Sequence, residues 1–227
     1  TTDKGNDTLE FQSLDSKNIN SGAGNDTVIV NQGASSSNIQ LGEGNNSYTV
    51  AGSLNSGTTQ SGAGNDTLIV NQGASNTVIN LGDGNNKISI GEALNNSNIS
   101  TGNGNDTLIV GQASDNNIIS TGGGNDFVQL NHNVQGTKID LGTGNDGIRL
   151  SNEGHVNFNT ETLIDGKTDF DTLYLNGKET DYWIEDANHN KITYSQYVQE
   201  NKDINGYANK LFYIYEVDGN GTKQGSG

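Results

Sequence analysis

The chain has 227 residues, with 27 acidic and 11 basic side chains, a formal net charge of −16, and no Pro, Met or Cys. This balance argues against binding to a nucleic-acid backbone, which needs a Lys and Arg footprint, and the lack of Cys excludes disulfides and thiolate metal sites. Hydrophobic residues make up only 30% of the chain, a share that is typical of disorder unless the apolar residues are regularly spaced.

A short motif, Gly-x-Gly-Asn-Asp or Gly-x-Gly-Asn-Asn, recurs with a period of 20 residues. Its full copies begin at Gly22, Gly42, Gly62, Gly82, Gly102, Gly122 and Gly142, and a partial copy ends at Asp7. A fixed period of this length is the signature of a solenoid, in which each repeat forms one coil that stacks on the next.

Two short segments with alternating apolar residues lie in each repeat. The first follows the motif, as at 27–30 and 67–70, and the second precedes the next motif, as at 38–41 and 78–81. Their length and β-branched content predict strands. We therefore expect an all-β fold, a right-handed parallel β-roll or β-solenoid of about seven 20-residue coils over residues 1–150, with two short strands per coil.

Large and small residues also exchange between two other positions of the repeat. The pairs that show this are Leu14 with Ser21, Ala34 with Leu41, Leu54 with Ser61, and Ala74 with Leu81. Close-packed interiors require such volume compensation within each layer, so we expect both positions to face the core.

Stacking in register aligns the last residue of every motif along one edge of the solenoid. This set, called the acidic column below, comprises Asp7, Asp26, Asn46, Asp66, Asn86, Asp106, Asp126 and Asp146. Neighbours in such a column are ~4.8 Å apart, so carboxylates there repel one another unless a cation lies between successive coils. The paired glycines allow positive φ angles that turn carbonyl oxygens inward, which gives the all-oxygen surroundings that suit Ca²⁺.

These motifs resemble the nonapeptide G-G-x-G-x-D-x-U-x of the repeats-in-toxin family, whose members form calcium-binding β-rolls. Over residues 3–150 the resemblance implies several calcium ions in a ladder along one edge, with the acidic column as side-chain ligands. It also implies backbone carbonyl ligands from Gly22, Gly24, Gly42, Gly44, Gly62, Gly64, Gly82, Gly84, Gly102, Gly104, Gly122, Gly124, Gly142 and Gly144.

The chain departs from the family pattern in three ways. Ser, Thr or Leu replaces the first Gly of the nonapeptide, and each coil carries one motif instead of two, so metal is expected on one edge only. Asn46 and Asn86 replace the acid, and we expect Glu43 and Asp83, in the same two turns, to restore part of the missing charge.

The period ends near residue 150, and Trp183 and most of the Tyr residues follow it. Because the end of a solenoid exposes its core, we expect a β-rich capping region over 151–227, with a degenerate last repeat at 169–175. Capping accounts for the aromatic residues, and the alternative interpretation is a ligand platform formed by Tyr182, Trp183, Tyr213 and Tyr215.

The family resemblance implies calcium-induced folding, since binding energy at a site absent from the unfolded chain is folding energy. The expected role is that of a structural module in a larger secreted or cell-surface bacterial protein, such as a type I-secreted adhesin or surface-layer protein. An outward rank in which Ile29, Ile69 and Ile109 alternate with polar residues is a candidate contact face for neighbouring protein chains.

Two binding functions remain open beside this role. One is a carbohydrate-binding module of a secreted polysaccharide-active enzyme, or one that recognises cell-surface glycan, for which only the capping region offers aromatic residues. The other is an ice-binding face, less favoured because the position between the glycines carries no regular Thr. We expect no enzyme, since the motifs H-E-x-x-H and G-x-S-x-G are absent, and no membrane span, since no apolar run reaches about 18 residues.

Overall fold

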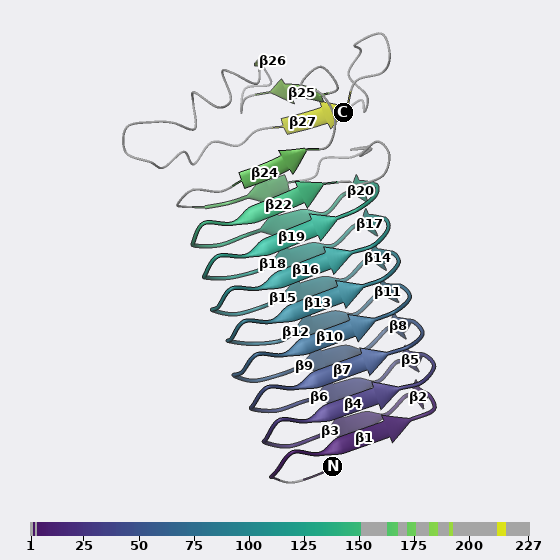
Figure 1. The fold of residues 1–227 in the computed structure, drawn as a ribbon. Helices are drawn as coiled ribbons and strands as arrows, with labels where there is room; N and C mark the ends of the chain where they lie inside the picture. The colour runs from purple at the N-terminus through teal and green to yellow at the C-terminus, as the bar shows by residue number, and fades with distance from the viewer. Residues whose placement is uncertain are drawn as a thin grey trace.

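The computed structural model describes residues 2, 4–150, 163–167, 172–175, 182–185, 191–192 and 213–216. The described chain forms β-strands and turns and no helix, and it winds into a stack of 20-residue coils (Figure 1). Every pair of neighbouring strands in the stack is parallel and in register, as where Val28 lies beside Tyr48 and Ile39 beside Thr59. The parallel β-solenoid expected from the repeat is therefore confirmed, and an ordinary hairpin at the Asn-Asp turns is excluded.

Each of the seven coils from β1 to β21 contributes one strand to each of three parallel sheets, and later strands extend the first and third sheets. The first sheet contains nine strands, β1 (Thr8–Phe11), β4 (Thr27–Val30), β7 (Ser47–Val50), β10 (Thr67–Val70), β13 (Lys87–Ile90), β16 (Thr107–Val110), β19 (Phe127–Leu130), β22 (Gly147–Leu150) and β24 (Thr172–Leu175). The second contains seven two-residue strands, β2 (Leu14–Asp15), β5 (Ala34–Ser35), β8 (Leu54–Asn55), β11 (Ala74–Ser75), β14 (Leu94–Asn95), β17 (Ser114–Asp115) and β20 (Val134–Gln135). The third contains eight strands, β3 (Asn18–Asn20), β6 (Asn38–Gln40), β9 (Thr58–Gln60), β12 (Val78–Asn80), β15 (Asn98–Ser100), β18 (Ile118–Ser120), β21 (Lys138–Asp140) and β23 (Leu163–Asp165).

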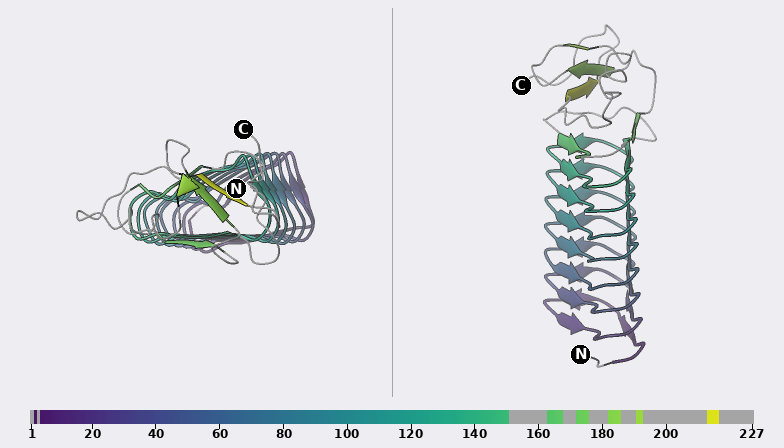
Figure 2. Two further views of the ribbon diagram at one scale, coloured as in Figure 1. Left: turned by 90° about the horizontal axis from the view of Figure 1, so that it is seen from above. Right: turned by 90° about the vertical axis from the view of Figure 1, so that its left-hand side faces the viewer.

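The expectation of two strands per coil is wrong, because the segment that looked like a second turn contains the short strands of the second sheet. Each of these strands has one inward residue, such as Leu14 or Ala34, and one outward residue. Two residues are too few to show alternation in the sequence, so only the stacking of equivalent positions reveals the strand. Viewed along its axis, the solenoid encloses a narrow interior between the sheets (Figure 2).

The interior is a single continuous core. In the first sheet the pattern of half-buried and buried residues alternates strictly, so that Val28 and Val30 of β4 are fully buried and Thr27 and Ile29 are half-buried on the outer face. The two compensating positions also face inward, since Ala34 and Leu41 are both buried in one coil. The predicted exchange of large and small residues is thus confirmed as core packing.

The solenoid continues past residue 150. Strand β24 pairs in parallel with β22, and Leu173 lies beside Ile148, so residues 172–175 of the expected degenerate repeat stack on the solenoid. Three further strands, β25 (Tyr182–Glu185), β26 (Lys191–Ile192) and β27 (Tyr213–Glu216), form a separate antiparallel sheet at the C-terminal end of the stack (Figure 1).

Candidate metal-binding column

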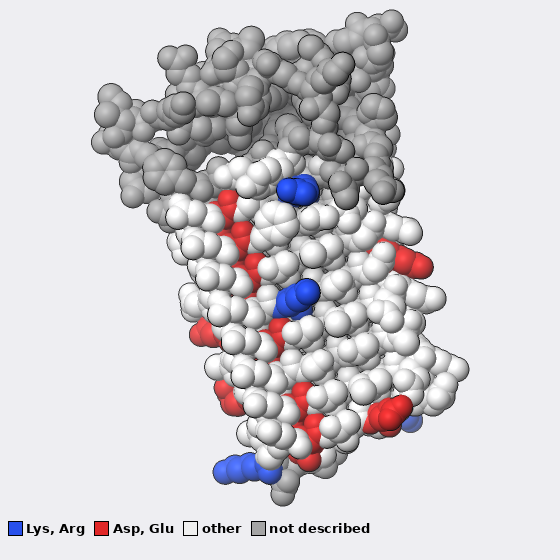
Figure 3. Space-filling model, viewed as in Figure 1, with Lys and Arg blue, Asp and Glu red and all other residues white. Residues whose placement is uncertain are grey.

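The acidic column runs along the inside of the corner that precedes the first sheet. Each member comes directly before a strand of that sheet, as Asp26 comes before β4 and Asp66 before β10. Although these side chains are charged or polar, Asp66 is 0% exposed and Asp106 is 2% exposed. Figure 3 shows a stripe of acidic residues at this corner that is broken twice along its length. The column therefore lies within the wall of the solenoid and not on its outer edge.

One terminal oxygen of every column residue after Asp7 belongs to a ladder that joins consecutive coils. The backbone N–H of Asp26 donates to Oδ1 of Asn46 at 2.9 Å, and the N–H of Asn46 donates to Oδ1 of Asp66 at 2.7 Å. The same bond recurs from Asp66 to Asn86 and from Asn86 to Asp106. Asp and Asn serve this ladder equally well, so the ladder does not explain why the sequence uses both.

The second terminal atom separates the two residue types. In Asn46 it is Nδ2, which donates to the carbonyl oxygens of Gly44 at 2.9 Å and Gly42 at 3.2 Å. In Asn86 the same atom donates to Gly82 O at 2.8 Å and Gly84 O at 3.1 Å. The asparagine turns are thus fully paired, and the glycine carbonyls point at the column residue as the family resemblance implies.

At the aspartate positions the corresponding atom is Oδ2, an acceptor placed where the amide would donate. It is buried and makes no hydrogen bond in Asp7, Asp26, Asp66, Asp106 and Asp126. Like charge density on the carboxylate and on the glycine carbonyls is unfavourable in a buried place, and a buried polar atom without a partner calls for an explanation. Hydroxyl groups of Ser61, Thr101 and Thr121 act on the carboxyls of Asp66, Asp106 and Asp126 and lower their pKa, but they leave Oδ2 without a partner. A cation or a proton would supply the missing partner.

Burial acts on the ionisation of these carboxyls in the expected direction. Desolvation raises the pKa of Asp106 to about 6, while the backbone N–H of Asn86 opposes the rise. Burial also raises the pKa of Asp66 and of Asp126, and a backbone N–H opposes it in each case. The negative charge is therefore disfavoured as the column stands, and a bound cation would remove that penalty.

Backbone geometry explains why the motif carries two glycines. Gly44 has a φ of 110°, and a Cβ atom there would clash with the carbonyl oxygen of Gly24 in the preceding coil. Positive φ holds for most of the paired glycines, as predicted, but it is absent at Gly62 and Gly102. In those two turns the glycine N–H donates directly to the glycine carbonyl of the coil before it, at 2.8 Å in both cases.

The acidic residues of the asparagine turns lie outside the column. Glu43 and Asp83 are exposed, and their carboxylates accept the backbone N–H of Ala63 at 3.0 Å and of Asn103 at 2.8 Å. These hydrogen bonds connect each asparagine turn to the next coil on the outer surface of the solenoid. The Glu43 charge still acts on the column, because it contributes to the raised pKa of Asp66. The expectation that these acids restore part of the missing charge stays a prediction.

Two other polar ladders were not assigned from the sequence. The exposed residues before the column form an asparagine ladder, in which the N–H of Asn45 donates to Oδ1 of Asn25 at 2.8 Å. A second, buried ladder follows the two-residue strands, as where the N–H of Thr77 donates to the hydroxyl of Ser97 at 3.2 Å. The sequence signal for the buried ladder is the repeat position of Ser37, Thr77 and Ser97, at which no coil has an apolar side chain.

A metal at the column would draw mainly on backbone oxygens. Among the residues that the structure describes, no group of three or more His, Cys, Asp or Glu side chains is arranged to hold a metal ion. Each aspartate turn instead offers a buried carboxylate oxygen together with glycine carbonyls. These are hard oxygen donors of the kind that Ca²⁺ binds.

The outward isoleucines lie where the sequence places them. Ile29, Ile69 and Ile109 are half-buried on the outer face of β4, β10 and β16. Sequence reasoning missed two more exposed apolar side chains, Val78 and Ile118, on the third sheet. Contact of either face with another chain remains a prediction.

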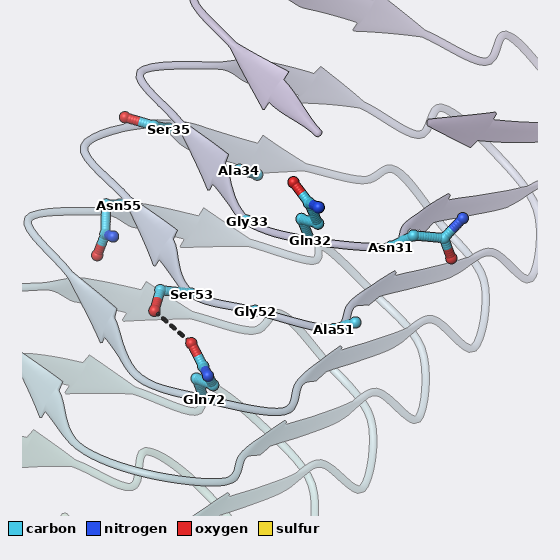
Figure 4. A pocket seen from close by; sticks show the side chains of 10 residues that line it. All are labelled: Asn31, Gln32, Gly33, Ala34, Ser35, Ala51, Gly52, Ser53, Asn55 and Gln72. Carbon is cyan, nitrogen blue, oxygen red and sulfur yellow. Dashed lines mark hydrogen bonds between the residues drawn. The ribbon is translucent and has the colours of Figure 1, made fainter. Parts of the chain in front are cut away.

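A shallow hollow of about 500 Å³ lies on the opposite corner of the solenoid (Figure 4). Its lining includes the amide side chains of Gln32, Asn55 and Gln72, and Gln72 accepts a hydrogen bond from the Ser53 hydroxyl at 3.1 Å. The hollow shares no residue with the acidic column and offers no aromatic ring on which a sugar could stack.

The backbone register of the antiparallel sheet places Trp183 opposite Tyr215 and Tyr213 opposite Glu185. The side chains of these residues and of Tyr182 lie outside the described part of the structure. The platform expected there stays a prediction.

No protein-family model matches the chain, and comparisons with curated proteins and with solved structures also find no match. Within the described residues, no helix is long and apolar enough to cross a membrane. The functional argument therefore depends on the geometry of the column.

Proposed function

We propose that this chain is a calcium-binding structural module whose folding is completed by calcium at the aspartate turns. The observation that carries the proposal is the contrast within one column. Where the residue is Asn46, an amide donates to two glycine carbonyls, and where it is Asp66 a buried carboxylate oxygen has no partner. A cation supplies in the second case what the amide supplies in the first.

Calcium fits this position better than other common metals. The donors are a carboxylate and backbone carbonyls, which are hard oxygen ligands, and Ca²⁺ accepts irregular oxygen cages more readily than Mg²⁺ does. The absence of Cys removes the thiolate ligands that soft metals prefer. A divalent charge also reduces the repulsion between carboxylates in consecutive coils, such as Asp106 and Asp126.

Calcium binding and folding are coupled in this proposal. The column exists only when coils are stacked, so an unfolded chain has no such site and the binding free energy stabilises the folded state. The structure is compatible with a β-roll of the repeats-in-toxin type. The chain would then remain incompletely folded at low intracellular calcium, pass through a type I secretion channel, and complete its folding outside the cell as part of an adhesin or surface-layer protein.

The test is a calcium titration of the metal-stripped chain, followed by far-UV circular dichroism, with the stoichiometry measured by calorimetry. We expect a cooperative gain of β-structure and several ions per chain, with no more ions than aspartate turns. Magnesium in place of calcium is the matched control and should produce a weaker response. A chain that is fully folded in chelator, and that takes up no calcium, would overturn the proposal.

A further inference from the structure

The coils of Asn46 and Asn86 differ from the others in more than the column residue. In both coils an apolar residue, Leu41 or Leu81, is buried where most aspartate coils have Ser or Thr. Both also carry an exposed acid between the glycines. Leu141, in the coil of Asp146, shows that the Leu alone does not define this type of turn.

These changes produce a turn that is closed on both sides without a ligand. On the inside, the Asn46 amide uses its donor capacity on Gly42 O and Gly44 O. On the outside, the Glu43 carboxylate accepts the N–H of Ala63 in the following coil at 3.0 Å. The turn of Asn86 repeats both arrangements, with Asp83 in the outer position and Asn103 as its donor.

The second turn repeats the first, two coils away, at the same place in a 40-residue super-period of the sequence. Four features recur together in both, namely the buried Leu, the outer acid, the column Asn, and a following glycine without positive φ. At these glycines, Gly62 and Gly102, the N–H donates to the first glycine carbonyl of the asparagine turn, Gly42 O or Gly82 O, at 2.8 Å. Because the same side-chain and backbone features recur in both turns, we interpret them as parts of one type of turn.

We infer that Asn46 and Asn86 are built-in substitutes for the cation, so that their turns close without metal and divide the acidic column into three separate groups. The groups are the pair Asp7 and Asp26, the single Asp66, and the run of Asp106, Asp126 and Asp146. The inference rests on the proposed function for the identity of the cation, but the metal-free closure of the two turns stands on geometry alone.

The division has a consequence for calcium binding. Asp66 has an amide turn on either side, so no neighbouring carboxylate shares its cation. In the run that begins at Asp106, carboxylates of consecutive coils are ~4.8 Å apart, so binding at one level eases repulsion at the next. Uptake in the run should therefore be cooperative, and uptake at Asp66 should be independent.

The experiment introduces the acid where the amide now lies, with the double variant Asn46→Asp and Asn86→Asp in the full chain. We expect two additional calcium ions per chain by calorimetry and a lower urea midpoint in chelator. The matched control is Asn45→Asp with Asn85→Asp, which adds the same charge at exposed neighbouring positions. The control should leave the calcium stoichiometry unchanged.

The reverse variant, Asp66→Asn, covers the case in which the double variant fails to fold. It should remove one ion from the stoichiometry and raise the urea midpoint in chelator. An unchanged stoichiometry in N46D/N86D, or a lower metal-free midpoint in D66N, would overturn the inference. If the unmodified chain binds no calcium, the proposed function fails, while the metal-free response of D66N still decides whether an amide closes the turn.

Discussion

Replacing Asp106 by Asn should make the metal-free solenoid more stable, because this residue combines nearly complete burial with a raised pKa. Its side chain is 2% exposed, its Oδ2 has no partner, and burial raises its pKa from the ordinary 3.8 to about 6. At about 1.4 kcal/mol per pKa unit, this rise corresponds to about 3 kcal/mol of destabilisation once the carboxyl is ionised. An amide removes that charge and can donate to the carbonyls of Gly102 and Gly104, as Asn86 donates to Gly82 and Gly84.

The assay is urea unfolding followed by far-UV circular dichroism, with and without calcium. In chelator at about pH 8, D106N should raise the free energy of unfolding by about 3 kcal/mol, and the gain should shrink at about pH 4. In excess calcium the sign should reverse, because the variant loses a cation that the unmodified chain retains. The control Glu92→Gln removes one charge from an exposed side chain and should change stability little.

The reasoning fails if D106N is less stable than the unmodified chain in chelator at about pH 8. It also fails if the exposed control E92Q gives an equal gain, since the effect would then come from net charge. If D106N raised the free energy of unfolding equally in calcium and in chelator, Asp106 would not be a calcium ligand, although its burial would still destabilise the metal-free fold.

Three further predictions concern the same fold. Burial raises the folded-state pKa values of Asp66, Asp106 and Asp126, so these groups should destabilise the metal-free chain as the pH rises from about 4 through about 6. Urea midpoints measured across this range test the prediction, and a midpoint that rises with pH would contradict it. Gly44→Ala should destabilise by about 3 kcal/mol, because φ is 110° and the Cβ would clash with Gly24 O, whereas Gly33→Ala, at a position without positive φ, is the milder control in the same unfolding assay. Tyr48→Phe should raise the free energy of unfolding by about 1 kcal/mol, because it removes a buried hydroxyl that has no hydrogen-bond partner; a large loss of stability would show that the hydroxyl is paired.

The period of the sequence predicts most of the fold, because stacking repeats one layer of packing. Once Val28 faces inward, the pleat and the period fix the inward positions of the whole first sheet, and the exchange between Ala34 and Leu41 identifies two more positions of the core. The sequence did not predict the second sheet, because a strand of two residues shows no alternation of apolar and polar residues. The lack of positive φ at Gly62 and Gly102 was not predicted either, since the motif has the same glycines there as in the other turns.

The chemistry of the column could be predicted only in part from the sequence. Aligned aspartates indicate a cation, but they do not show that one carboxylate oxygen is already used by the backbone ladder and the other is left without a partner. Nor does the sequence show that Asn46 is complete in itself, because Asn and Asp have nearly the same shape. The distinction is visible only in which atoms face the carbonyls of Gly42 and Gly44.

A mixed column gives the solenoid a property that neither pure column has. If every level were Asn, each turn would close by itself and the stack would fold at any calcium concentration. If every level were Asp, each level would oppose folding without metal, and adjacent charges would add repulsion along the whole corner. With amide turns at two central levels, we expect some stacked coils to be stable in themselves. Under the proposed function, calcium would be required only to extend the order across the acidic groups on either side and at Asp66. The number of aspartates then sets how steeply folding depends on calcium, and the placement of the asparagines sets where folding begins.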